Sequence, residues 1–326
     1  MGYGGCFGFS DESDAEFFQR NGAELLEALI SSSDGKGNPI RIFSAKELEK
    51  ATDSYAQQIF LDHTAFLRCY RGTHQGRGIT VAILTDFSGR YVANEVAVLS
   101  KVNHWNVVKL VGCCLETKVP ILVYEELSCK TLYEHIHRAS SWCHVSWENR
   151  LKIATQAAYA LAYLHAGTPS PILHLDLHTR KILLCEGNTV KITGFEFSLS
   201  LPMGKTEVEC LRIFGTGGSH IDPLLLLEGG KLSDKTDVYS YGVVLFEILT
   251  GRKPFDIVDP DVKQRFCESI EEEHLISFID SSILPEAEKG AVTCARLAQK
   301  CLNVRTLEER PEMKQVVHEL QRIKGL

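Results

Sequence analysis

The apolar pattern of this 326-residue chain changes once, and that change constrains the fold class more than any other feature. In the first part of the chain, four short stretches are rich in β-branched and aromatic residues, as is typical of strands. These stretches are 66–71, 79–84, 107–115 and 121–124. From residue 130 onward, apolar residues recur at helical spacing, as they do across 151–164. A small sheet with one helix over 91–102, joined near 125–128 to a larger helical half, predicts a two-lobed α+β fold.

Charge and cysteine usage narrow the class of protein. With 35 basic and 42 acidic residues the formal net charge is −7, and nucleic-acid binding is not expected of so acidic a balance. The best apolar run, 241–249, is too short to span a membrane and contains Glu247. The 11 cysteines include no C-x-x-C pair, so the sequence predicts no zinc site and reduced thiols. We therefore expect a cytoplasmic protein.

Residues 1–42 are expected to form a tail and a short helix that precede a small lobe at 43–126 and a large lobe at 127–326. Apolar residues at helical spacing favour a helix over 17–30. They are Phe18, Leu25, Leu26, Leu29 and Ile30. The capping-box sequence Ser44-Ala-Lys-Glu47 favours a second helix that runs to about Thr52.

Met1-Gly2 opens a candidate myristoylation site. Myristate on Gly2 and palmitate on Cys6 would supply two lipid anchors, which stable membrane binding requires. Position 6 holds Cys where the motif prefers Ser or Thr, so an unmodified tail is the alternative. A peripheral location at the plasma membrane is therefore expected only if both residues are acylated.

Residues 174–181 have the spacing of a protein-kinase catalytic loop, H-R-D-x-K-x-x-N. Two of the five marked positions match, His174 and Asp176. The motif's Arg, Lys and metal-binding Asn are replaced by Leu175, His178 and Lys181. Thirteen residues after the loop, Gly194-Phe-Glu stands where the second metal ligand of a kinase, the Asp of D-F-G, is expected.

The positions that hold nucleotide phosphates in a kinase are also replaced. Leu84 ends Val81-Ala-Ile-Leu84, where V-A-I-K would place a Lys, and Glu95 then lacks its ion-pair partner and is interpreted as a solvated helix residue. The three glycines of the phosphate-cradling loop are replaced by Asp62, Thr64 and Leu67. The sequence therefore predicts a kinase fold without its reaction, for which no cofactor is expected, neither ATP nor magnesium.

The surviving Asp176 would orient the substrate hydroxyl in an active kinase. Here we interpret it as a residue that holds its loop by hydrogen bonds. Lys181 brings a positive charge to the metal position and could pair with Asp176. Metal-free ATP binding, assisted by Lys181 or by Arg68 on a neighbouring strand, is an alternative.

Residues of the kinase scaffold are retained. Asp237 is expected to tie the catalytic loop to a central helix, and Arg310 matches the late Arg of the large lobe. The usual Glu partner of that Arg, in A-P-E, is replaced by Leu224. An apolar run follows, which we interpret as a contact patch, and it consists of Leu224, Leu225, Leu226 and Leu227.

Many ordered motifs across residues 40–324 resemble the kinase domain of plant receptor-like kinases of the wall-associated type. They lie at 43–52, 94–96, 107–116, 122–125, 237–242 and 249–251. The segments 17–22 and 25–30 are similar to a smaller subfamily, the ZED-related kinases. That subfamily includes pseudokinases that serve as adaptors for a coiled-coil NLR immune receptor in plants.

The resemblance implies a catalytically impaired pseudokinase that acts as an adaptor or decoy in plant defence signalling. It implies two partners, the leucine-rich-repeat part of an NLR receptor and receptor-like cytoplasmic kinases modified by a pathogen. We expect docking surfaces at Leu25, Leu26 and Leu29, unless the small lobe covers them, and at the run 224–227. The alternatives are a weak or unconventional serine/threonine kinase and a nucleotide-binding switch without transfer.

Overall fold

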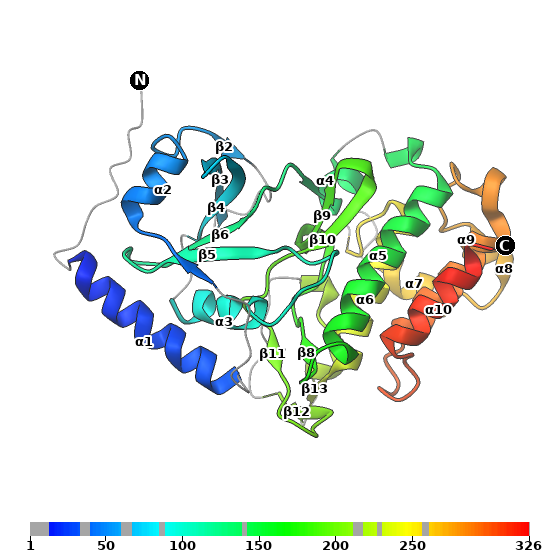
Figure 1. Cartoon of the computed structure of the whole chain (residues 1–326). Helices are drawn as coiled ribbons and strands as arrows, with labels where there is room; N and C mark the ends of the chain where they lie inside the picture. Colours follow the sequence, from blue (N-terminus) through cyan, green and yellow to red (C-terminus); the bar gives the residue numbers. More distant parts are fainter. Residues whose placement is uncertain are drawn as a thin grey trace. The chain divides into compact units, whose positions relative to one another are not determined.

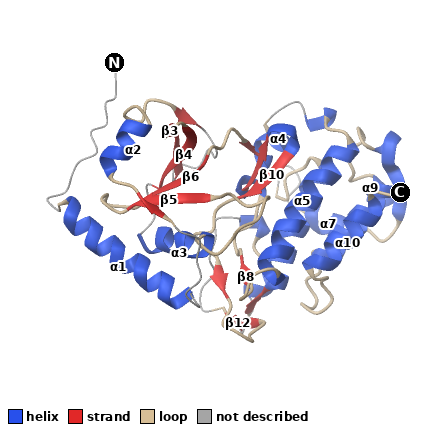
Figure 2. Cartoon of the chain, viewed as in Figure 1, coloured by secondary structure: helices blue, strands red, loops and turns tan. Residues whose placement is uncertain are grey.

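The computed structural model describes residues 13–32, 40–59, 67–84, 89–138, 142–210, 218–226, 230–255 and 261–325. The chain divides into two compact units. The first includes segments that end at Ile59, Ser100 and Glu126, and the second includes Lys101–Lys109 and the described residues from Leu127 onward. The first unit contains a six-stranded sheet, and the second unit is mostly helical (Figure 2). This confirms the predicted α+β class with a β-rich lobe and a helical lobe.

A six-stranded sheet forms the core of the first unit, in the order β1-β5-β6-β4-β3-β2. The strands are β1 (Arg41–Ile42), β2 (Gln58–Ile59), β3 (Leu67–His74), β4 (Arg77–Leu84), β5 (Leu110–Cys114) and β6 (Ile121–Glu125). β1 is parallel to β5, and the other neighbours are antiparallel. The β3–β4 hairpin turns at Gln75 and Gly76, whose φ angles of 50° and 75° suit a two-residue hairpin turn.

Three helices complete the first unit: α1 (Asp14–Ser32), α2 (Ala45–Ala51) and α3 (Gly89–Leu99). α2 begins at the predicted capping box, in which the Ser44 hydroxyl accepts the Glu47 backbone N–H and the Glu47 carboxylate accepts that of Ser44. Phe43 and Leu48 pack into one hydrophobic cluster with strand residues, among them Tyr70, Val81 and Val123. The capped helix therefore covers one face of the sheet.

Helix α1 lies along α3 in the first unit (Figure 1). The Asn21 side-chain amide donates to the carbonyl oxygens of Leu115 and Thr117, both at 2.8 Å. The Arg20 guanidinium donates to the Lys118 carbonyl oxygen at 2.9 Å. These bonds attach α1 to the connection between β5 and β6, so the helix is an integral part of the unit.

The second unit is built around one buried helix, α6 (Asp234–Thr250), which has a buried side chain at every position from Thr236 to Thr250. α5 (Trp147–Ala166) and α9 (Leu284–Cys301) pack against it, and α10 (Met313–Ile323) packs against both of these helices. The other helices of the unit are α4 (Leu132–His137), α7 (Val262–Glu268) and α8 (Glu272–Ile276). A helix at such a central position is expected to be mostly apolar, and its buried carboxylates Asp237 and Glu247 are hydrogen-bonded.

Short strands in the second unit carry the loops of interest. They are β7 (Lys130–Thr131), β8 (Ile172–Leu173), β9 (Ile182–Cys185), β10 (Thr189–Ile192), β11 (Leu199–Ser200), β12 (Glu207–Glu209) and β13 (Lys231–Ser233). They pair as β10-β9-β7, β11-β8 and β12-β13. The 3-10 turns are η1 (Trp142–His144), η2 (Thr179–Lys181), η3 (Glu186–Asn188), η4 (Gly218–His220) and η5 (Pro223–Leu226).

A disulfide joins Cys129 to Cys185, so the prediction of reduced thiols is wrong at these two positions. β7 and β9 are antiparallel with Lys130 opposite Leu184, and this register brings the two cysteines opposite each other with their Cα atoms 4.3 Å apart. They are 56 positions apart in the sequence. Among the helices in the described ranges, none is long and apolar enough to cross a membrane.

Candidate functional site

The catalytic-loop segment leaves β8 in the second unit and is held by Asp237 of α6. The Asp237 carboxylate accepts the backbone N–H groups of His174 and Leu175, both at 2.8 Å. Its Oδ2 also contacts His165 Nε2 at 2.8 Å. Burial alone would raise the pKa of Asp237, but the hydrogen bond and charge of His165 outweigh burial and lower the pKa. The predicted tie between loop and central helix is confirmed.

His174 links this loop to the segment that contains Gly194. Its Nε2 donates to the Thr193 carbonyl oxygen at 3.1 Å, and its ring lies 4.9 Å from that of Phe195. Its Nδ1 accepts the Asp176 backbone N–H at 3.3 Å. Burial lowers the pKa of His174, which favours the neutral ring that can donate and accept in this way.

The Lys181 ammonium lies between two carboxylates. Its Nζ is 2.5 Å from Glu196 Oε1 and 3.9 Å from Asp176 Oδ2. His178 Nε2 is 3.8 Å from the same Asp176 oxygen. The predicted pairing of Lys181 with Asp176 is confirmed. The shorter contact of Lys181 is to Glu196, to which the sequence analysis assigned no role. Both carboxylates are buried, so an ammonium in contact with them is the charge that their burial requires.

Gly194 leaves room for that ammonium. Its φ is +84°, and a Cβ atom built on it would lie 2.5 Å from Lys181 Cδ and 2.8 Å from Lys181 Nζ. Any residue with a side chain at position 194 would therefore collide with Lys181 as it stands. Lys181 and Gly194 form one coordinated replacement of the two positions that bind metal in a kinase.

In the first unit, two apolar residues occupy the phosphate-binding positions. Leu67 on β3 and Leu84 on β4 are directly opposite each other in the strand pair, and Leu84 is buried. Arg68 is opposite Ile83, so strand alternation directs its side chain to the other face of the sheet from Leu84. A substitute cation at Arg68 is therefore not supported. Asp62 and Thr64 lie outside the described residues.

Glu95 is not the solvated helix residue that the sequence suggested. It is 2% exposed, and its Oε1 accepts the hydroxyl hydrogen of Tyr124 on β6 at 2.7 Å. The helix that carries it, α3, turns this carboxylate toward the sheet and not toward water, because its neighbours Val92, Val96 and Leu99 are also buried. A strand hydroxyl thus contributes to satisfying a carboxylate that a Lys would bind in a kinase.

Leu175 has become part of an apolar cluster with Leu173, Leu201 and Leu232, and Leu225 of η5 packs against the same cluster. The φ of Leu175 is +66°, which is unfavourable for a non-glycine residue and costs on the order of 1–3 kcal/mol. The side chains at 224–226 are half-buried, and the interpretation of this run as a contact patch stays a prediction. Leu227 lies outside the described residues.

Arg310 retains a carboxylate partner. The sequence analysis expected that partner at position 224, where it found Leu224, and did not identify Asp222. Arg310 Nη1 and Nη2 donate to Asp222 Oδ2 at 2.5 Å and to Oδ1 at 2.8 Å. Both side chains are fully buried. A two-residue shift of the acid along the chain therefore preserves the ion pair. Because two N–H donors meet two oxygens, this pair has the strong bidentate geometry.

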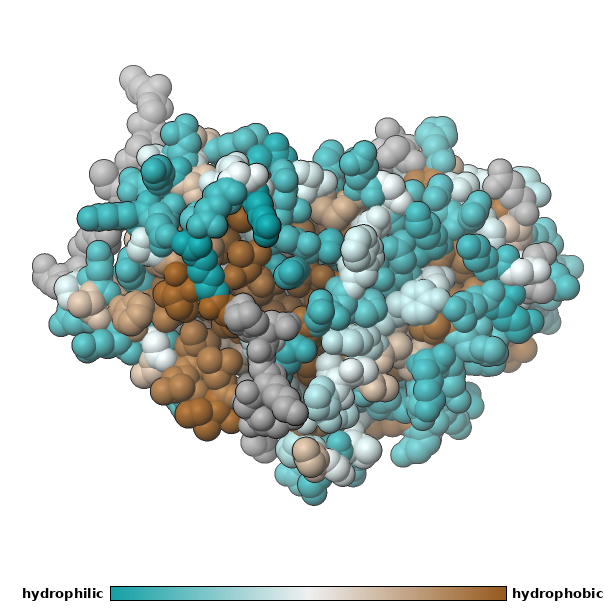
Figure 3. Space-filling view, in the orientation of Figure 1, coloured by the Kyte–Doolittle hydropathy of each residue, from teal (hydrophilic) through white to brown (hydrophobic). Residues whose placement is uncertain are grey.

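The predicted docking residues of α1 divide between two environments. Leu25 is 8% exposed, Leu29 is half-buried, and Leu26 is 59% exposed. Phe18 and Ile30 are also exposed, and they lie eight residues before and four residues after Leu26 in the helix. Figure 3 shows hydrophobic surface over the C-terminal part of α1. Burial by the small lobe, the alternative reading, thus applies to Leu25, whereas Leu26 faces outward. Gly2 and Cys6 lie outside the described residues.

Comparison with known proteins identifies the family. Residues 61–320 match the model of the protein tyrosine and serine/threonine kinase family. Wall-associated receptor kinase-like 1 of Arabidopsis thaliana is 38% identical over 319 residues, which are 95% of this chain and 43% of that protein. Wall-associated receptor kinase 4 of the same plant is 37% identical over 318 residues, 95% of this chain and 42% of that protein.

A further relative, wall-associated receptor kinase-like 16 of Arabidopsis thaliana, is 35% identical over 318 residues, which are 95% of this chain and 72% of that protein. The chain spans less than half the length of the first two relatives. The match to the family model and the matches to these relatives cover both units. The chain belongs to the protein tyrosine and serine/threonine kinase family and is homologous to the kinase domain of wall-associated receptor kinases.

Proposed function

We propose that this chain is a pseudokinase of the ZED-related type that works by docking, as an adaptor or decoy for an NLR immune receptor in plant defence. The observation that carries the chemical part is the Lys181 ammonium, in contact with Glu196 and Asp176 where a kinase holds metal ions. A divalent cation placed there would be repelled by the ammonium. Gly194 supplies no carboxylate that could compensate.

The rate consequence follows from the number of missing groups. Loss of one preorganised electrostatic group typically costs about 10²–10³ in rate. Here Leu84, Lys181 and Gly194 each replace such a group, so a surviving Asp176 cannot restore transfer. We propose that neither ATP nor magnesium is a cofactor. We also propose that Asp176 holds its loop in place by hydrogen bonds.

A weak serine/threonine kinase is the second candidate, and one observation favours it. Asp176 lies in a loop whose attachment to Asp237 is intact, and this supports a role for Asp176 like that of the kinase residue that orients a substrate hydroxyl. The family relationship is compatible with either function. The distinction therefore depends on nucleotide binding and transfer.

The docking part rests on the resemblance of the α1 segment and on its outward apolar side chains. We propose the leucine-rich-repeat part of an NLR receptor and receptor-like cytoplasmic kinases as partners, with α1 around Leu26 and the segment at Leu224–Leu226 as surfaces. The proposed location is cytoplasmic, and peripheral at the plasma membrane if Gly2 and Cys6 are acylated.

Calorimetric titration of the whole chain with Mg-ATP, together with its melting temperature, tests the chemical part. We expect no binding heat and no shift in melting temperature, because a ligand stabilises only a native state that it binds. Incubation with labelled ATP and manganese should leave the protein and generic substrates unlabelled. Labelling that disappears in Asp176→Asn would replace the pseudokinase proposal with the weak-kinase one.

A further inference from the structure

The disulfide between Cys129 and Cys185 lies in the second unit, close in the chain to the catalytic loop. Cys129 directly precedes β7, and Cys185 is the last residue of β9. β9 begins directly after η2, the 3-10 turn that contains Lys181. The bond therefore joins the strand that follows the catalytic loop to residues 130–138, which we call the β7–α4 segment.

The β7–α4 segment has a short backbone connection to its sheet. β7 has two residues, lies at the edge of the sheet β10-β9-β7, and pairs with β9 at Lys130 and Thr131. α4 has six residues and begins after Thr131, whose hydroxyl accepts the Glu134 backbone N–H at 3.1 Å. A helix of this length is unstable on its own, so α4 depends on its contacts with neighbouring elements.

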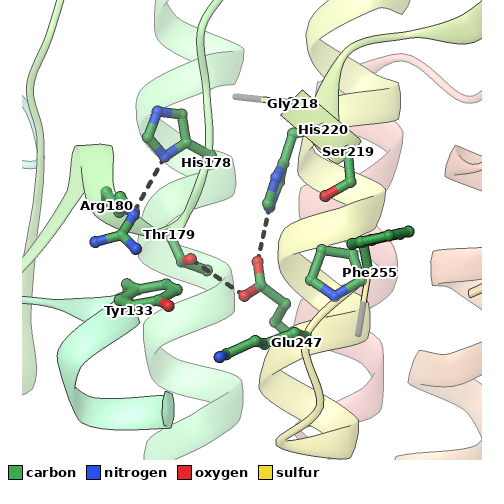
Figure 4. A pocket seen from close by; sticks show the side chains of 11 residues that line it. Tyr133, His178, Thr179, Arg180, Gly218, Ser219, His220, Glu247 and Phe255 are labelled. Atoms are coloured by element: carbon green, nitrogen blue, oxygen red, sulfur yellow. Dashed lines mark hydrogen bonds and ion pairs between the residues drawn. The ribbon is translucent and has the colours of Figure 1, made fainter. Parts of the chain in front are cut away.

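Side chains of α4 contact both α6 and η2. His137 Nε2 lies 2.5 Å from Glu247 Oε2 of α6. The guanidinium carbon of Arg180 in η2 lies 3.5 Å from the centre of the Tyr133 ring, and Figure 4 shows the guanidinium over that ring. Both contacts require α4 to stay docked. A movement of the β7–α4 segment would therefore change the surroundings of the catalytic loop.

The bond is open to thiol chemistry, because Cys129 and Cys185 are each half-buried and not enclosed in the core. In the cytoplasm, the location proposed above, glutathione and thioredoxin keep thiols reduced, and the disulfides found there are usually transient or redox-sensing. A dithiol reduces such a bond by thiolate attack on one sulfur, which releases the other cysteine, and its second thiol then resolves the mixed disulfide. The two cysteines gain two electrons and two protons, and the dithiol loses them and becomes a disulfide.

We propose that the Cys129–Cys185 bond is a reversible redox switch that controls local opening of the β7–α4 segment. In the oxidised form the bond fixes the segment to the end of β9. In the dithiol form the segment is held to the sheet by the two-residue pairing of β7 and can open while the rest of the unit stays folded. Opening exposes Leu132 and Ile136, which are buried in the closed form. The two redox forms therefore differ in the apolar surface that they present next to the catalytic loop.

Hydrogen–deuterium exchange of the whole chain, before and after treatment with reduced thioredoxin, tests the proposal. Treatment should add two thiols, counted by maleimide labelling and mass, and glutathione disulfide should remove them again. The amides of α10 report the change in global stability, because α10 packs against α5 and α9. We expect exchange in 130–138 to become about tenfold or more faster on reduction, beyond any increase in α10.

Serine variants assign the effect to this bond. Cys129→Ser and Cys185→Ser should each exchange as the reduced parent does, with or without thioredoxin. Cys143→Ser is the matched control, because Cys143 is an exposed thiol outside the bond, and this variant should keep the redox dependence of the parent. If a variant fails to fold, the comparison of the oxidised and reduced parent chain still decides the question.

Three results would overturn the proposal. A bond that resists reduced thioredoxin in the native chain would be a structural cross-link and not a switch. Reduction that leaves exchange in 130–138 unchanged would show that the bond does not hold the segment. An equal increase in 130–138 and in α10 would show an effect on global stability alone. These measurements use neither ATP nor a partner protein, so their outcome is separate from that of the tests of the proposed function.

Discussion

Gly194 lies directly against the side chain of Lys181, and the position of the Lys181 ammonium depends on the absence of a side chain at residue 194. The distances from a Cβ atom at position 194 to Lys181 Cδ, Cε and Nζ are 2.5, 2.8 and 2.8 Å. Cβ atoms in proteins do not approach other atoms so closely. A kinase has a carboxylate at the first position and an amide at the second, with a metal ion between them. This chain has a hydrogen atom and an ammonium.

We expect Gly194→Ala to destabilise the fold by more than Gly204→Ala. Gly204 has a similar φ of +76° but no atom within 4 Å of its Cβ direction, so it reports the backbone cost alone. In the double variant Gly194→Ala/Lys181→Asn the collision is removed, and we expect a coupling of about 0.5–3 kcal/mol. Unfolding in urea measures the four free energies. Additive losses would show that the two positions are independent.

Glu247 should make stability depend on pH below its ordinary pKa. Burial alone would raise the pKa of Glu247, but the charges and hydrogen bonds of His220 and His137 lower it from 4.5 to about 2. The stabilisation is therefore fully present above pH 4.5 and is lost as pH falls toward 2, an effect on the order of 3 kcal/mol. Glu247→Gln should flatten this part of the stability profile.

The surface carboxylate Glu27 of α1 provides the control for that experiment, since it is exposed. Glu27→Gln should leave the acid limb nearly unchanged. Denaturant unfolding at a series of pH values between 2 and 6 makes the comparison. A Glu247→Gln variant with the same acid slope as the parent chain would contradict the assignment of this slope to Glu247.

The disulfide should be countable in solution. The chain has 11 cysteines, and the bond between Cys129 and Cys185 leaves nine thiols. Thiol titration of denatured, unreduced protein should therefore give nine, provided that Cys6 is not acylated. Cys129→Ser should lower stability by about 2–5 kcal/mol without reductant and have a much smaller effect with reductant. A count of eleven before reduction would show that the bond does not form.

Leu25 and Leu26 make a matched pair for separating stability from docking. Leu25→Ala removes buried apolar volume and should cost about 2 kcal/mol or more. Leu26→Ala changes an exposed side chain and should leave the melting temperature unchanged. Reduced co-precipitation of the NLR receptor by folded Leu26→Ala is the expected result for a docking surface. Normal co-precipitation would remove this face of α1 from the proposed interface.

Elements set by local pattern were predictable from the sequence. Helical spacing located α1 and α5, and the Ser44–Glu47 capping box located the start of α2, because short-range contacts decide these features. Asp237 was also identified, since its position relative to the catalytic loop is part of a recognisable motif.

Contacts between distant segments could not be predicted in the same way. The sequence does not show that Glu196 is the partner of Lys181 or that Asp222 is the partner of Arg310. Both contacts depend on how the loops that carry these residues fold back on each other. The disulfide depends on the register of β7 with β9, which no spacing in the sequence specifies. Burial of Glu95 depends on which face of α3 meets the sheet. Each of these is a tertiary relationship, and each lies at or near a position where the kinase motif is altered.

The hydrogen bonds of Asn21 have a consequence for the extent of the folded module. The family match begins at residue 61, yet the carbonyl oxygens of Leu115 and Thr117 inside that match accept their bonds from α1. A segment that began at residue 61 would lack α1, so both carbonyl oxygens would lose their Asn21 donor and the face that Leu25 covers would be exposed to water. The folded module therefore extends upstream of the region that the family model matches, and it includes α1.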